Sequence, residues 1–462
     1  MTDLAALVAA APGSLVLPAG DRRASVQVPE PLRLLDSCDL GSARYIGVVE
    51  DSEGGRWTVP LVVDASGVRR ALPGDGVAEA LVRGIADVRQ MHRTHGPALT
   101  PEGAAVQGDR SFVADAWYAE DATGERGLTV DQTNESVVVG DRAMVKWAVH
   151  LPPGGVRGAQ PAGDRIAALA EAGFTETPRP WGLLQWAAPD GATVLLASVT
   201  SYLDGAEDGW DWAVADVNAA TVVPGAASPG AMDRALEGPR RIGALTARMH
   251  VALAAHGVGT ATADDVARWE ADARAELDEA LRILDGEEGE RLRARADRIA
   301  AAYDGLARHV GTPLIPVHGD YHVGQVLRTP SADPTLRFDY AVTDFDGNPV
   351  RPPEQRSDPQ PAALDAVGML ASLDHVGRVV LERTEGADPA LVRTWIAAAQ
   401  EAFRYEYVDT LARMRHAHLF DEALAVPLRL QQEVREFLYA AKHLPHWRYV
   451  PDGALRDLLP DV

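Results

Sequence analysis

The sequence predicts an α+β fold with two lobes, in which an N-terminal cap subdomain precedes a strand-rich lobe and a large helical C-terminal lobe. Three observations predict this fold. Short apolar strands separated by turn residues fill about the first 205 residues, and helical repeats of apolar residues follow from Asp208. A strand-loop-strand block at about residues 313–345 interrupts the helices. The predicted boundaries are residues 1–125, 126–205 and 206–462.

The predicted cap, residues 1–125, rests on strand patterning and turn residues. Tyr45–Val49 and Trp57–Val63 are apolar runs, and Asp51–Gly55 between them is typical of a hairpin turn. Phe112–Trp117 is a further strand candidate, and Asp75–Gln90 is a predicted helix. None of these segments carries a chemical motif, so we expect a structural or capping role.

The region from 126 to 205 predicts a sheet. Its strand candidates are Leu128–Asp131, Ser136–Val139, Arg142–Ala148, Trp181–Trp186 and Ala192–Thr200. The first three are separated by short polar turns and predict an antiparallel meander. Asp164–Gly173 is a predicted short helix that ends on a glycine, a residue that often terminates helices.

The helical lobe is predicted from apolar residues spaced three and four apart. Thr262 and Asp265 form a possible capping box at the start of one such segment. Its apolar positions are Val266, Trp269, Ala273, Leu277, Leu281 and Leu284, and those of the next segment are Leu292, Ala296, Ile299, Tyr303, Leu306 and Val310. The two segments meet at Asp285–Gly286 and predict a helical hairpin. Further helices are expected at about 363–376, 391–414 and 427–443.

Composition limits the partners and the compartment. The 462 residues contain 44 Lys and Arg against 67 Asp and Glu, a formal net charge of −23, which excludes nucleic acid and anionic lipid as general partners. A single cysteine, Cys38, allows no intramolecular disulfide and favours a reducing compartment. The start, Met1–Asp3, lacks the basic region of a signal peptide, and no apolar run is long enough to span a membrane. We expect a cytoplasmic protein, monomeric or a simple homo-oligomer.

Polar residues gather in the strand-loop-strand block. The apolar strand Ile315–Val317 leads into a polar loop, His318–Gln325, and an apolar strand leaves it. A second strand, Tyr340–Val342, ends in an acidic glycine turn, Asp344–Gly347. We expect both loops to open at the same edge of one small hairpin. This would bring together Asp320, Gln325, Asp344 and Asp346.

That residue set suits phosphoryl transfer, which needs a carboxylate to accept a hydroxyl proton and cations to neutralise phosphate charge. Asp320 and Gln325 have the five-residue separation of the kinase catalytic loop, and Asp344 begins a turn like the kinase DFG turn. Mg²⁺ prefers oxygen ligands, including carboxylates. We therefore predict Asp320 as the base and Gln325 and Asp344 as ligands of Mg²⁺. Asp346 is either a third ligand or a group that supports the ligands.

These motifs resemble the actinobacterial maltokinases, which have an aminoglycoside-phosphotransferase-like, protein-kinase-like fold with an extra N-terminal cap. The resemblance rests on His318–Asp320 with Gln325, on Asp344–Pro349, and on Asn134–Ser136 before a strand with Lys146. Gly209–Asp211, Arg351 to Arg356 and Asp365–Leu370 are similar to the family too. The chain differs from it in having Asp346 where those proteins have Glu, and Asn348 where they have an acid.

The C-terminal segment Gln431–Trp447 resembles instead the related actinobacterial glucosamine kinases, which phosphorylate a cationic monosaccharide. On a helix, Gln432, Glu436, Tyr439 and His443 share one face, and Glu433 lies beside it. A carboxylate can pair an ammonium group, and an aromatic face can pack on a pyranose ring. The resemblance therefore implies a sugar site formed by His322, Glu433, Glu436, Tyr439 and Trp447.

The nucleotide site follows from the same kinase reading. Lys146 would contact the ATP phosphates, Ser136 would bind phosphate at the end of the loop, and Asp164 or Glu171 would pair with Lys146. Ser201 and Tyr202 would form a hinge that offers backbone groups to adenine. His318 is expected to hold the loop backbone and His322 to line the pocket.

The first expected reaction is conversion of glucosamine to glucosamine 6-phosphate with Mg²⁺ and ATP. The alternatives are conversion of maltose to maltose 1-phosphate, phosphorylation of a polycationic aminoglycoside, and nucleotide or sugar binding by a pseudokinase that lacks turnover. A metallohydrolase is a further alternative. It would use His318 and His322 as metal ligands and would act without ATP.

Overall fold

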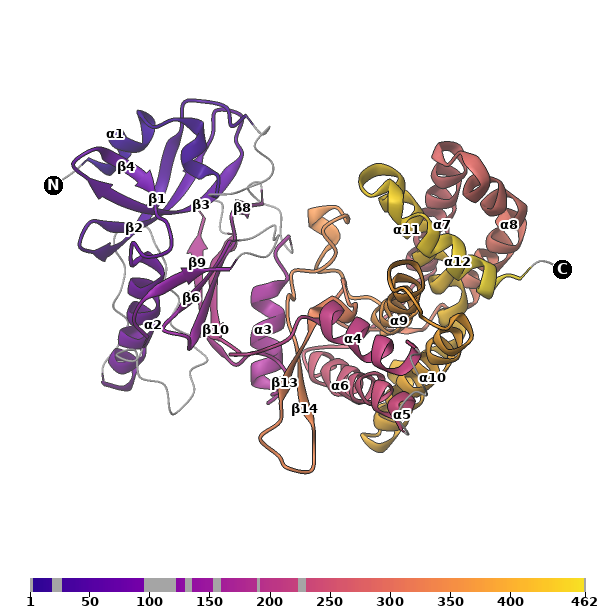
Figure 1. The fold of residues 1–462 in the computed structure, drawn as a ribbon. Coiled ribbons are helices and arrows are strands. Elements are labelled where there is room, and N and C mark those ends of the chain that lie inside the picture. The colour runs from indigo at the N-terminus through magenta and orange to yellow at the C-terminus, as the bar shows by residue number, and fades with distance from the viewer. Residues whose placement is uncertain are drawn as a thin grey trace. The chain divides into compact units, whose positions relative to one another are not determined.

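The structure, a computed structural model of the chain, describes residues 3–18, 27–94, 122–128, 135–152, 159–188, 192–222 and 230–460 (Figure 1). It divides into two compact units. One contains residues 1–170, 178–205 and 350–357, and the other contains residues 171–177, 206–349 and 358–462. Strands dominate the first unit and helices the second, so the prediction of a two-lobed α+β fold is confirmed.

The first unit begins with an antiparallel sheet. Its strands run in the order β1 (Arg33–Gly41), β2 (Arg44–Glu50), β3 (Arg56–Asp64) and β4 (Gly67–Arg70), and β8 (His150–Leu151) pairs with β3. Helix α1 (Leu4–Ala9) and the 3₁₀ helix η1 (Gly13–Val16) share a small apolar core with β2 and β3. The predicted hairpin turn is confirmed, because the Asp51 carboxylate accepts the backbone N–H groups of Glu53 and Gly55, both at 2.9 Å.

A second antiparallel sheet follows. Its strands are β5 (Glu125–Gly127), β6 (Glu135–Val139), β7 (Ala143–Trp147), β10 (Thr193–Ser201) and β9 (Pro180–Ala187), in that spatial order. The second and third strands of the predicted meander are confirmed as β6 and β7. The strand that pairs with β6 on its other side is β5, which ends one residue before the predicted first strand, Leu128–Asp131. Residues 129–131 of that predicted strand, and all of Phe112–Trp117, lie outside the described residues.

Both sheets share one apolar core. Helix α2 (Val77–Thr94) contributes Leu81, Val82 and Ile85 to it. They pack with Ile46 and Val48 of the first sheet and with residues of the second, among them Val137, Val145, Trp147 and Trp186. The first compact unit therefore contains both predicted regions, 1–125 and 126–205, and their division into separate domains remains a prediction.

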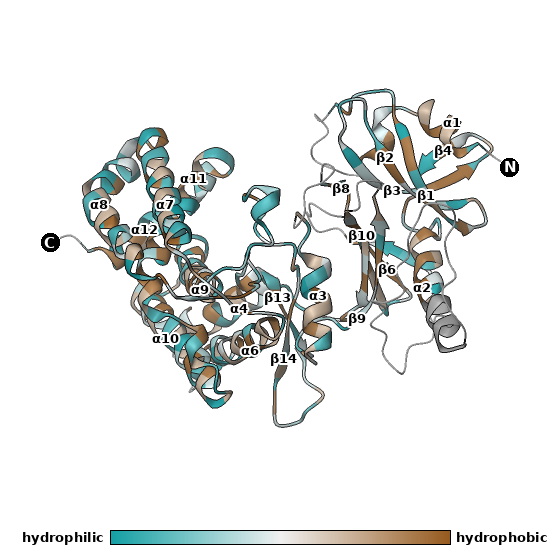
Figure 2. Cartoon of the chain, turned by 180° about the vertical axis from the view of Figure 1, so that it is seen from behind, coloured by the Kyte–Doolittle hydropathy of each residue, from teal (hydrophilic) through white to brown (hydrophobic). Residues whose placement is uncertain are grey.

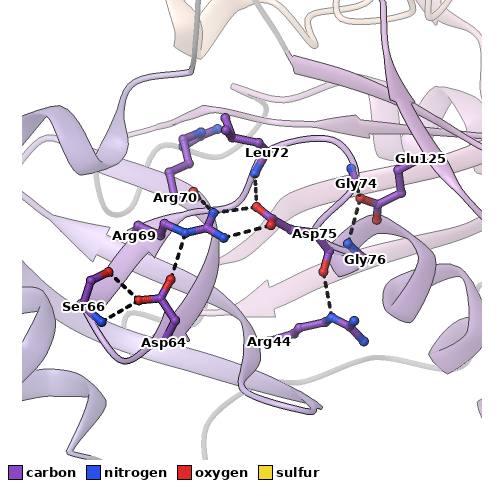
Figure 3. A network of polar contacts seen from close by, with 10 residues as sticks. All are labelled: Arg44, Asp64, Ser66, Arg69, Arg70, Leu72, Gly74, Asp75, Gly76 and Glu125. Carbon is purple, nitrogen blue, oxygen red and sulfur yellow. Dashed lines mark hydrogen bonds and ion pairs between the residues drawn. The ribbon is translucent and has the colours of Figure 1, made fainter.

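Polar contacts join the same elements (Figure 3). The Asp75 carboxylate accepts two hydrogen bonds from Arg69, at 2.6 and 2.9 Å, and Arg69 also pairs with Asp64. Glu125, the first residue of β5, accepts the backbone N–H groups of Gly74 and Gly76 and that of Glu79 in the first turn of α2. A carboxylate at a helix N-terminus is stabilised by the helix dipole, so Glu125 ties the second sheet to α2.

The second unit is built from helices. They are α4 (Gly209–Thr221), α5 (Ala231–Ala235), α6 (Glu237–Ala254), α7 (Ala263–Ile283), α8 (Gly286–Asp304), α9 (Ala363–Arg383), α10 (Pro389–Arg413), α11 (Ala425–His443) and α12 (Tyr449–Leu458). Short 3₁₀ helices lie at η4 (Gly305–Arg308), η5 (Val323–Gln325), η7 (Ala417–Leu419), η8 (Glu422–Leu424) and η9 (Pro445–Trp447). Within the described ranges, none of the helices combines the length and the hydropathy needed to cross a bilayer.

The predicted helical hairpin is α7 followed by α8. Thr262 and Asp265 form the capping box in both directions, and Asp285 is the N-cap residue of α8. Figure 2 shows hydrophobic and hydrophilic residues along both helices, as expected of amphipathic segments. The prediction for Val310 is wrong, because α8 ends at Asp304 and the side chain of Val310 is 55% exposed. The chain turns at Gly311, whose φ of +95° favours glycine, so the helical spacing no longer applies.

The embedded hairpin is β13 (Val326–Pro330) paired with β14 (Phe338–Val342), with Val326 opposite Val342. Gln325 and Thr343 therefore lie at the same end, as predicted. The expected strand Ile315–Val317 is wrong. The strand there is β12 (Pro313–Leu314), which pairs with β11 (Gly259–Thr260), and Ile315 makes only an isolated bridge with Gln360. These residues are apolar because they are buried among α6 and α9 residues, which periodicity cannot distinguish from a buried strand.

Gly209, the first residue of α4, contacts the backbone of η5. A Cβ atom at Gly209 would lie 1.8 Å from the carbonyl oxygen of Val323. We expect Gly209→Ala to lower the free energy of unfolding by about 3 kcal/mol, since backbone must move to relieve this contact. Chemical denaturation measures the change. Gly305→Ala is the control, because that glycine has a φ of −63° and no atom within 4 Å of the added Cβ. Equal stability of the two variants would contradict the prediction.

Candidate active site

The loop that carries Asp320 is held by one buried carboxylate, Asp365, in the first turn of α9. Its Oδ2 accepts the backbone N–H of His318 at 2.6 Å, and its Oδ1 accepts that of Gly319 at 2.8 Å. Asp365 is 1% exposed. Two N–H donors on one buried carboxylate fix the backbone conformation immediately before Asp320.

Asp365 is supported in turn by α6 and α10. Its Oδ2 also accepts from His250 Nε2 at 3.1 Å, and His250 Nδ1 lies 2.8 Å from the Tyr407 hydroxyl. The Nε2–H tautomer of neutral His250 satisfies both contacts, with Tyr407 as the donor to Nδ1. Burial alone would raise the pKa of Asp365. The hydrogen bond from His250 and the other donors outweigh burial and lower it, so the carboxylate stays ionised.

The side chain of His318 joins the two loops of the site. His318 is fully buried, and its Nε2 lies 2.9 Å from the Thr343 carbonyl oxygen, which requires Nε2 to carry the proton. Its Nδ1 accepts the backbone N–H of Asp320 at 3.4 Å. The rings of Phe345 and Tyr321 pack against it at 5.0 and 5.3 Å. The expectation that His318 holds loop backbone is confirmed, and a metal-ligand role does not fit these contacts.

Gln325 and Asp344 come together at the end of the hairpin. The backbone N–H of Thr343 donates to the Gln325 carbonyl oxygen at 2.9 Å. Asp344 has a φ of +66°, a left-handed conformation that costs a non-glycine residue of order 1–3 kcal/mol. Such strain is typical of functional sites, and here the hairpin and His318 hold the turn on both sides.

Asp320 lies in an acidic, largely buried environment. Burial raises its pKa to about 7, and the negative charges of Asp344, Glu436 and Asp365 add to the effect. Asp344 and Glu436, far apart in sequence, are thus both close enough to Asp320 to act on its charge. His322 responds in the opposite sense, since burial and the neighbouring His318 lower its pKa to about 4. A carboxyl group that titrates near neutral pH suits a general base.

The donors around Gln325 fit a magnesium ion. Within the described ranges, no group of three or more His, Cys, Asp or Glu side chains could hold a metal by itself. Mg²⁺ is commonly bound by one or two carboxylates and completed by phosphate oxygens and water. The amide of Gln325 and the carboxylates of Asp344 and Asp346 are oxygen donors of this kind. These oxygen donors suit a hard cation such as Mg²⁺ better than a transition metal that prefers nitrogen or sulfur ligands.

A chain of aromatic rings links the catalytic loop to the C-terminal helices. The His322 ring lies 6.4 Å from that of Trp210, in the first turn of α4. Trp210 meets Trp447 of η9 edge to face at 6.3 Å, and Trp447 meets His375 of α9 at 6.4 Å. A Cβ atom at Gly324 would lie 2.9 Å from Trp210, so this glycine lets the indole rest on the loop. The structure thus brings His322 and Trp447, two predicted sugar-site residues, into one cluster.

The predicted face of α11 is confirmed by contacts along it. Gln432 Nε2 donates to Glu436 Oε1 at 3.1 Å, and the rings of Tyr439 and His443 lie 5.0 Å apart. Tyr439 is 46% exposed, whereas Glu436 is partly buried, and no ion pair joins Glu436 to a cation among the described residues. Burial, the largest effect, raises the pKa of Glu436. Glu436 therefore presents an acidic group that no residue of the described ranges neutralises through a direct ion pair.

Glu433 has a different environment from the one that its predicted role requires. It is fully buried, with Oε1 2.8 Å from Arg429 Nη1 and Oε2 3.3 Å from His375 Nε2. Because Glu433 has no exposed surface and contacts two basic side chains, its structural role is to fix Arg429 and His375 in position. The burial favours such a supporting role over direct contact with a sugar.

Two of the predicted nucleotide residues, Ser136 and Lys146, lie on one face of the second sheet. Ser136, Lys146 and Ser198 are directly opposite one another on β6, β7 and β10. Alternate residues, such as Val145 and Trp147, point to the other face and enter the core shared with the first sheet. The face with Lys146 also carries Leu183 and Leu195, against which α3 (Ala162–Glu171) packs through Ala162 and Ile166. Gln132–Asn134 of the predicted phosphate loop lie outside the described residues.

The other residues predicted to bind the nucleotide lie on α3 and at the end of β10. Asp164 lies in the first turn of α3 with an exposed side chain, so its pairing with Lys146 remains a prediction. At the predicted hinge, the Ser201 N–H donates to the Arg179 carbonyl and the Tyr202 N–H to the Arg142 carbonyl, both at 2.7 Å. Adenine contacts with these residues would therefore use carbonyl oxygens rather than N–H groups.

Sequence reasoning did not assign roles to Asp365, His375, Trp210 or Ser198. Asp365 and Trp210 belong to segments that resemble the maltokinases, and that resemblance was the one signal available for them. Ser198 becomes visible only through strand register, because it lies opposite Lys146. His375 lies within a mostly apolar helix, and nothing in its spacing separates it from a core histidine.

The raised pKa of Asp320 predicts an acidic limit to activity. The base must be ionised to accept a proton, so kcat/KM should fall as pH decreases through about 7, the pKa of Asp320. Initial rates at saturating nucleotide, measured across this range, test the prediction. Glu436→Gln removes one neighbouring negative charge and should move the acidic limb to lower pH. A limb near pH 4, the ordinary carboxyl range, would contradict it.

Comparison with known proteins identifies the family. No protein-family model matches the chain. The glucosamine kinase of Streptacidiphilus jiangxiensis is 57% identical over 458 residues, 98% of both chains, and that of Mycolicibacterium smegmatis is 41% identical over 428 residues, 92% of this chain and 98% of that protein. A solved glucosamine kinase in complex with glucosamine, ADP and inorganic phosphate is 53% identical, with a TM-score of 0.81 over 99% of this chain and 100% of the other. The chain therefore belongs to the glucosamine kinase family.

Proposed function

We propose that this protein transfers the γ-phosphoryl group of ATP to a hydroxyl of glucosamine and forms glucosamine 6-phosphate. The observation that carries the proposal is the pair of acids in the helical unit. Asp320 has a pKa near 7, and Glu436 is close enough to act on its charge and makes no ion pair with a cation within the described ranges. One acid suits proton transfer and the other suits an ammonium group. The names of the relatives and the glucosamine and ADP bound to the solved relative support this assignment.

Asp320 would accept the proton of the attacking hydroxyl as the phosphoryl group moves in line. The bonds from Asp365 and His318 hold the loop, so Asp320 needs little reorganisation when substrate binds. Gln325, Asp344 and Asp346 would hold Mg²⁺. The ion supplies positive charge that neutralises the phosphates.

On the nucleotide side, we assign phosphate contacts to Lys146 and Ser136, with Ser198 as a third polar group in the same row of the sheet. Lys146 supplies the positive charge and the hydroxyl groups supply hydrogen bonds. Asp164 remains the proposed partner of Lys146, and the carbonyl groups of Ser201 and Tyr202 remain the proposed adenine contacts.

On the sugar side, we assign the ammonium contact to Glu436 and the pyranose-packing contacts to Trp447 and His322. The lowered pKa of His322 keeps its ring neutral, so it does not repel a cationic sugar. Tyr439 lies on the exposed continuation of the same face of α11 and would contact substrate from its edge. Glu433 would act by holding Arg429 and His375.

We further propose that the protein works in the cytoplasm, where ATP is available and a single free cysteine is stable. A monomer or a simple homo-oligomer remains the expected state.

The deciding experiment measures ADP release with Mg-ATP and glucosamine, glucose, maltose or kanamycin. We expect turnover on glucosamine, lost on chelation with EDTA, and a decrease of at least 10²-fold in kcat for Asp320→Asn. Turnover on maltose or kanamycin in place of glucosamine would overturn the proposed substrate while leaving the catalytic loop intact. Activity that is equal in wild type and Asp320→Asn, or that persists without ATP, would overturn the kinase assignment.

The amine contact is tested with Glu436→Gln. Loss of a charge-assisted contact should raise the KM for glucosamine by about tenfold to a hundredfold and leave the KM for ATP within about twofold. Glu290→Gln, on the exposed surface of α8, is the matched control. If Glu436→Gln and the control have the same KM for glucosamine, another group recognises the amine.

A further inference from the structure

His375 lies behind the proposed sugar site and is only 5% exposed. Its Nε2 is 3.3 Å from Glu433 Oε2, and the edge of its ring faces Trp447 at 6.4 Å. Because a carboxylate only accepts, Nε2 must carry a proton in either charge state of the imidazole. The charge of His375 therefore depends on whether Nδ1 also binds a proton.

The charged groups around His375 do not balance when the imidazole is neutral. Glu433 pairs with Arg429, Arg429 lies 3.9 Å from Asp374, and Asp374 makes two hydrogen bonds with Arg378 at 2.6 and 2.9 Å. Arg378 also pairs with Asp457 of α12 at 2.7 Å, and Glu436 and Arg383 lie at the edge of the cluster. The cluster then has four carboxylates and three guanidinium groups. The cluster thus carries one surplus negative charge, in surroundings where burial strengthens electrostatic interactions.

We propose that His375 sets the selectivity of the pocket for an amino sugar, because its imidazole and the substrate ammonium group compete to neutralise this surplus negative charge. The inference rests on the proposed glucosamine kinase activity and deepens it. When His375 is neutral, the surplus negative charge of the cluster can pair with the ammonium group of the substrate. Protonated His375 neutralises the charge and removes the advantage of a cationic sugar over a neutral one.

The groups that face His375 support this competition. They are Glu433, Glu436 and Arg429 of α11, Asp374 and Arg378 of its own helix, His322 of the catalytic loop, and Arg383, whose guanidinium lies 6.0 Å from the Trp447 ring centroid. Burial alone would lower the pKa of His375. Glu433 and Glu436 outweigh burial and raise it, so protonation occurs within an accessible pH range.

The dependence of sugar affinity on pH distinguishes an effect of the charge of His375 from an effect of its packing. As pH falls and His375 takes up a proton, the affinity for glucosamine should decrease by up to about tenfold per pH unit, whereas the affinity for glucose should not follow it. A histidine with only a packing role would affect the two sugars alike. Glu436 also loses charge in acid, so the part that belongs to His375 is the difference between proteins with and without it.

The experiment measures the dissociation constants of glucosamine and glucose by calorimetry between about pH 5.5 and 8.5, because the pKa of His375 lies above the ordinary imidazole value of about 6.5. The Asp320→Asn protein is the background, since it removes titration of the base. We expect the glucosamine affinity to decrease by tenfold or more toward acid in that protein, and by less than about threefold in Asp320→Asn/His375→Gln. The matched control, Asp320→Asn/His446→Gln, changes an exposed histidine of η9 and should retain the full dependence.

A second variant keeps the test valid if His375→Gln does not fold. Glu433→Gln removes one carboxylate and with it the surplus negative charge, so the affinity for glucosamine should decrease toward that for glucose and its dependence on pH should weaken. Superimposable pH profiles with and without His375, or equal dependence for glucose, would overturn the inference and leave the glucosamine kinase assignment standing. Absence of glucosamine binding at every pH would overturn both.

Discussion

The site depends on one buried carboxylate. Asp365 accepts the backbone N–H groups of His318 and Gly319 and the ring N–H of His250, so three segments of the helical unit meet at its two oxygens. An ionised carboxylate in a buried position is stable only when such donors surround it. Two of these donors are backbone N–H groups of the catalytic loop. The stability of the buried Asp365 carboxylate therefore depends on the conformation of that loop, and the conformation of the loop depends on Asp365.

Compensating donors also let acids accumulate in the helical unit without disrupting the fold. Backbone donors compensate Asp365, and arginine compensates Glu433. Glu436 has an amide donor but no ion pair within the described residues, and burial raises the pKa of both Glu436 and Asp320. The acids that carry the chemistry are therefore those that the protein leaves least compensated.

Much of this arrangement follows from local sequence. Strand and helix positions depend on periodicity and caps, which is why the α7–α8 hairpin and the meander could be predicted from residues such as Thr262 and Asp265. The hairpin of β13 and β14 places Gln325 next to Thr343 because loop edges follow from strand pairing. The stretch Ile315–Val317 was misassigned because burial by helices and burial by a sheet select the same apolar residues. Contacts between distant segments, such as Asp365 with His318 or Glu433 with His375, depend on helix packing that no local pattern encodes.

The core shared by the two sheets has a consequence for how this chain folds. Residues of the first sheet, such as Ile46 and Val48, and of α2, such as Leu81 and Ile85, cover the side of the second sheet that carries Trp147 and Trp186. Neither sheet can bury its apolar surface alone, so the strand-rich unit should melt as a single cooperative unit. A shortened chain that starts at Glu125 would expose these tryptophans and the neighbouring valines to water. The N-terminal region is then not a removable accessory, because its removal would leave a large apolar face exposed and prone to aggregation.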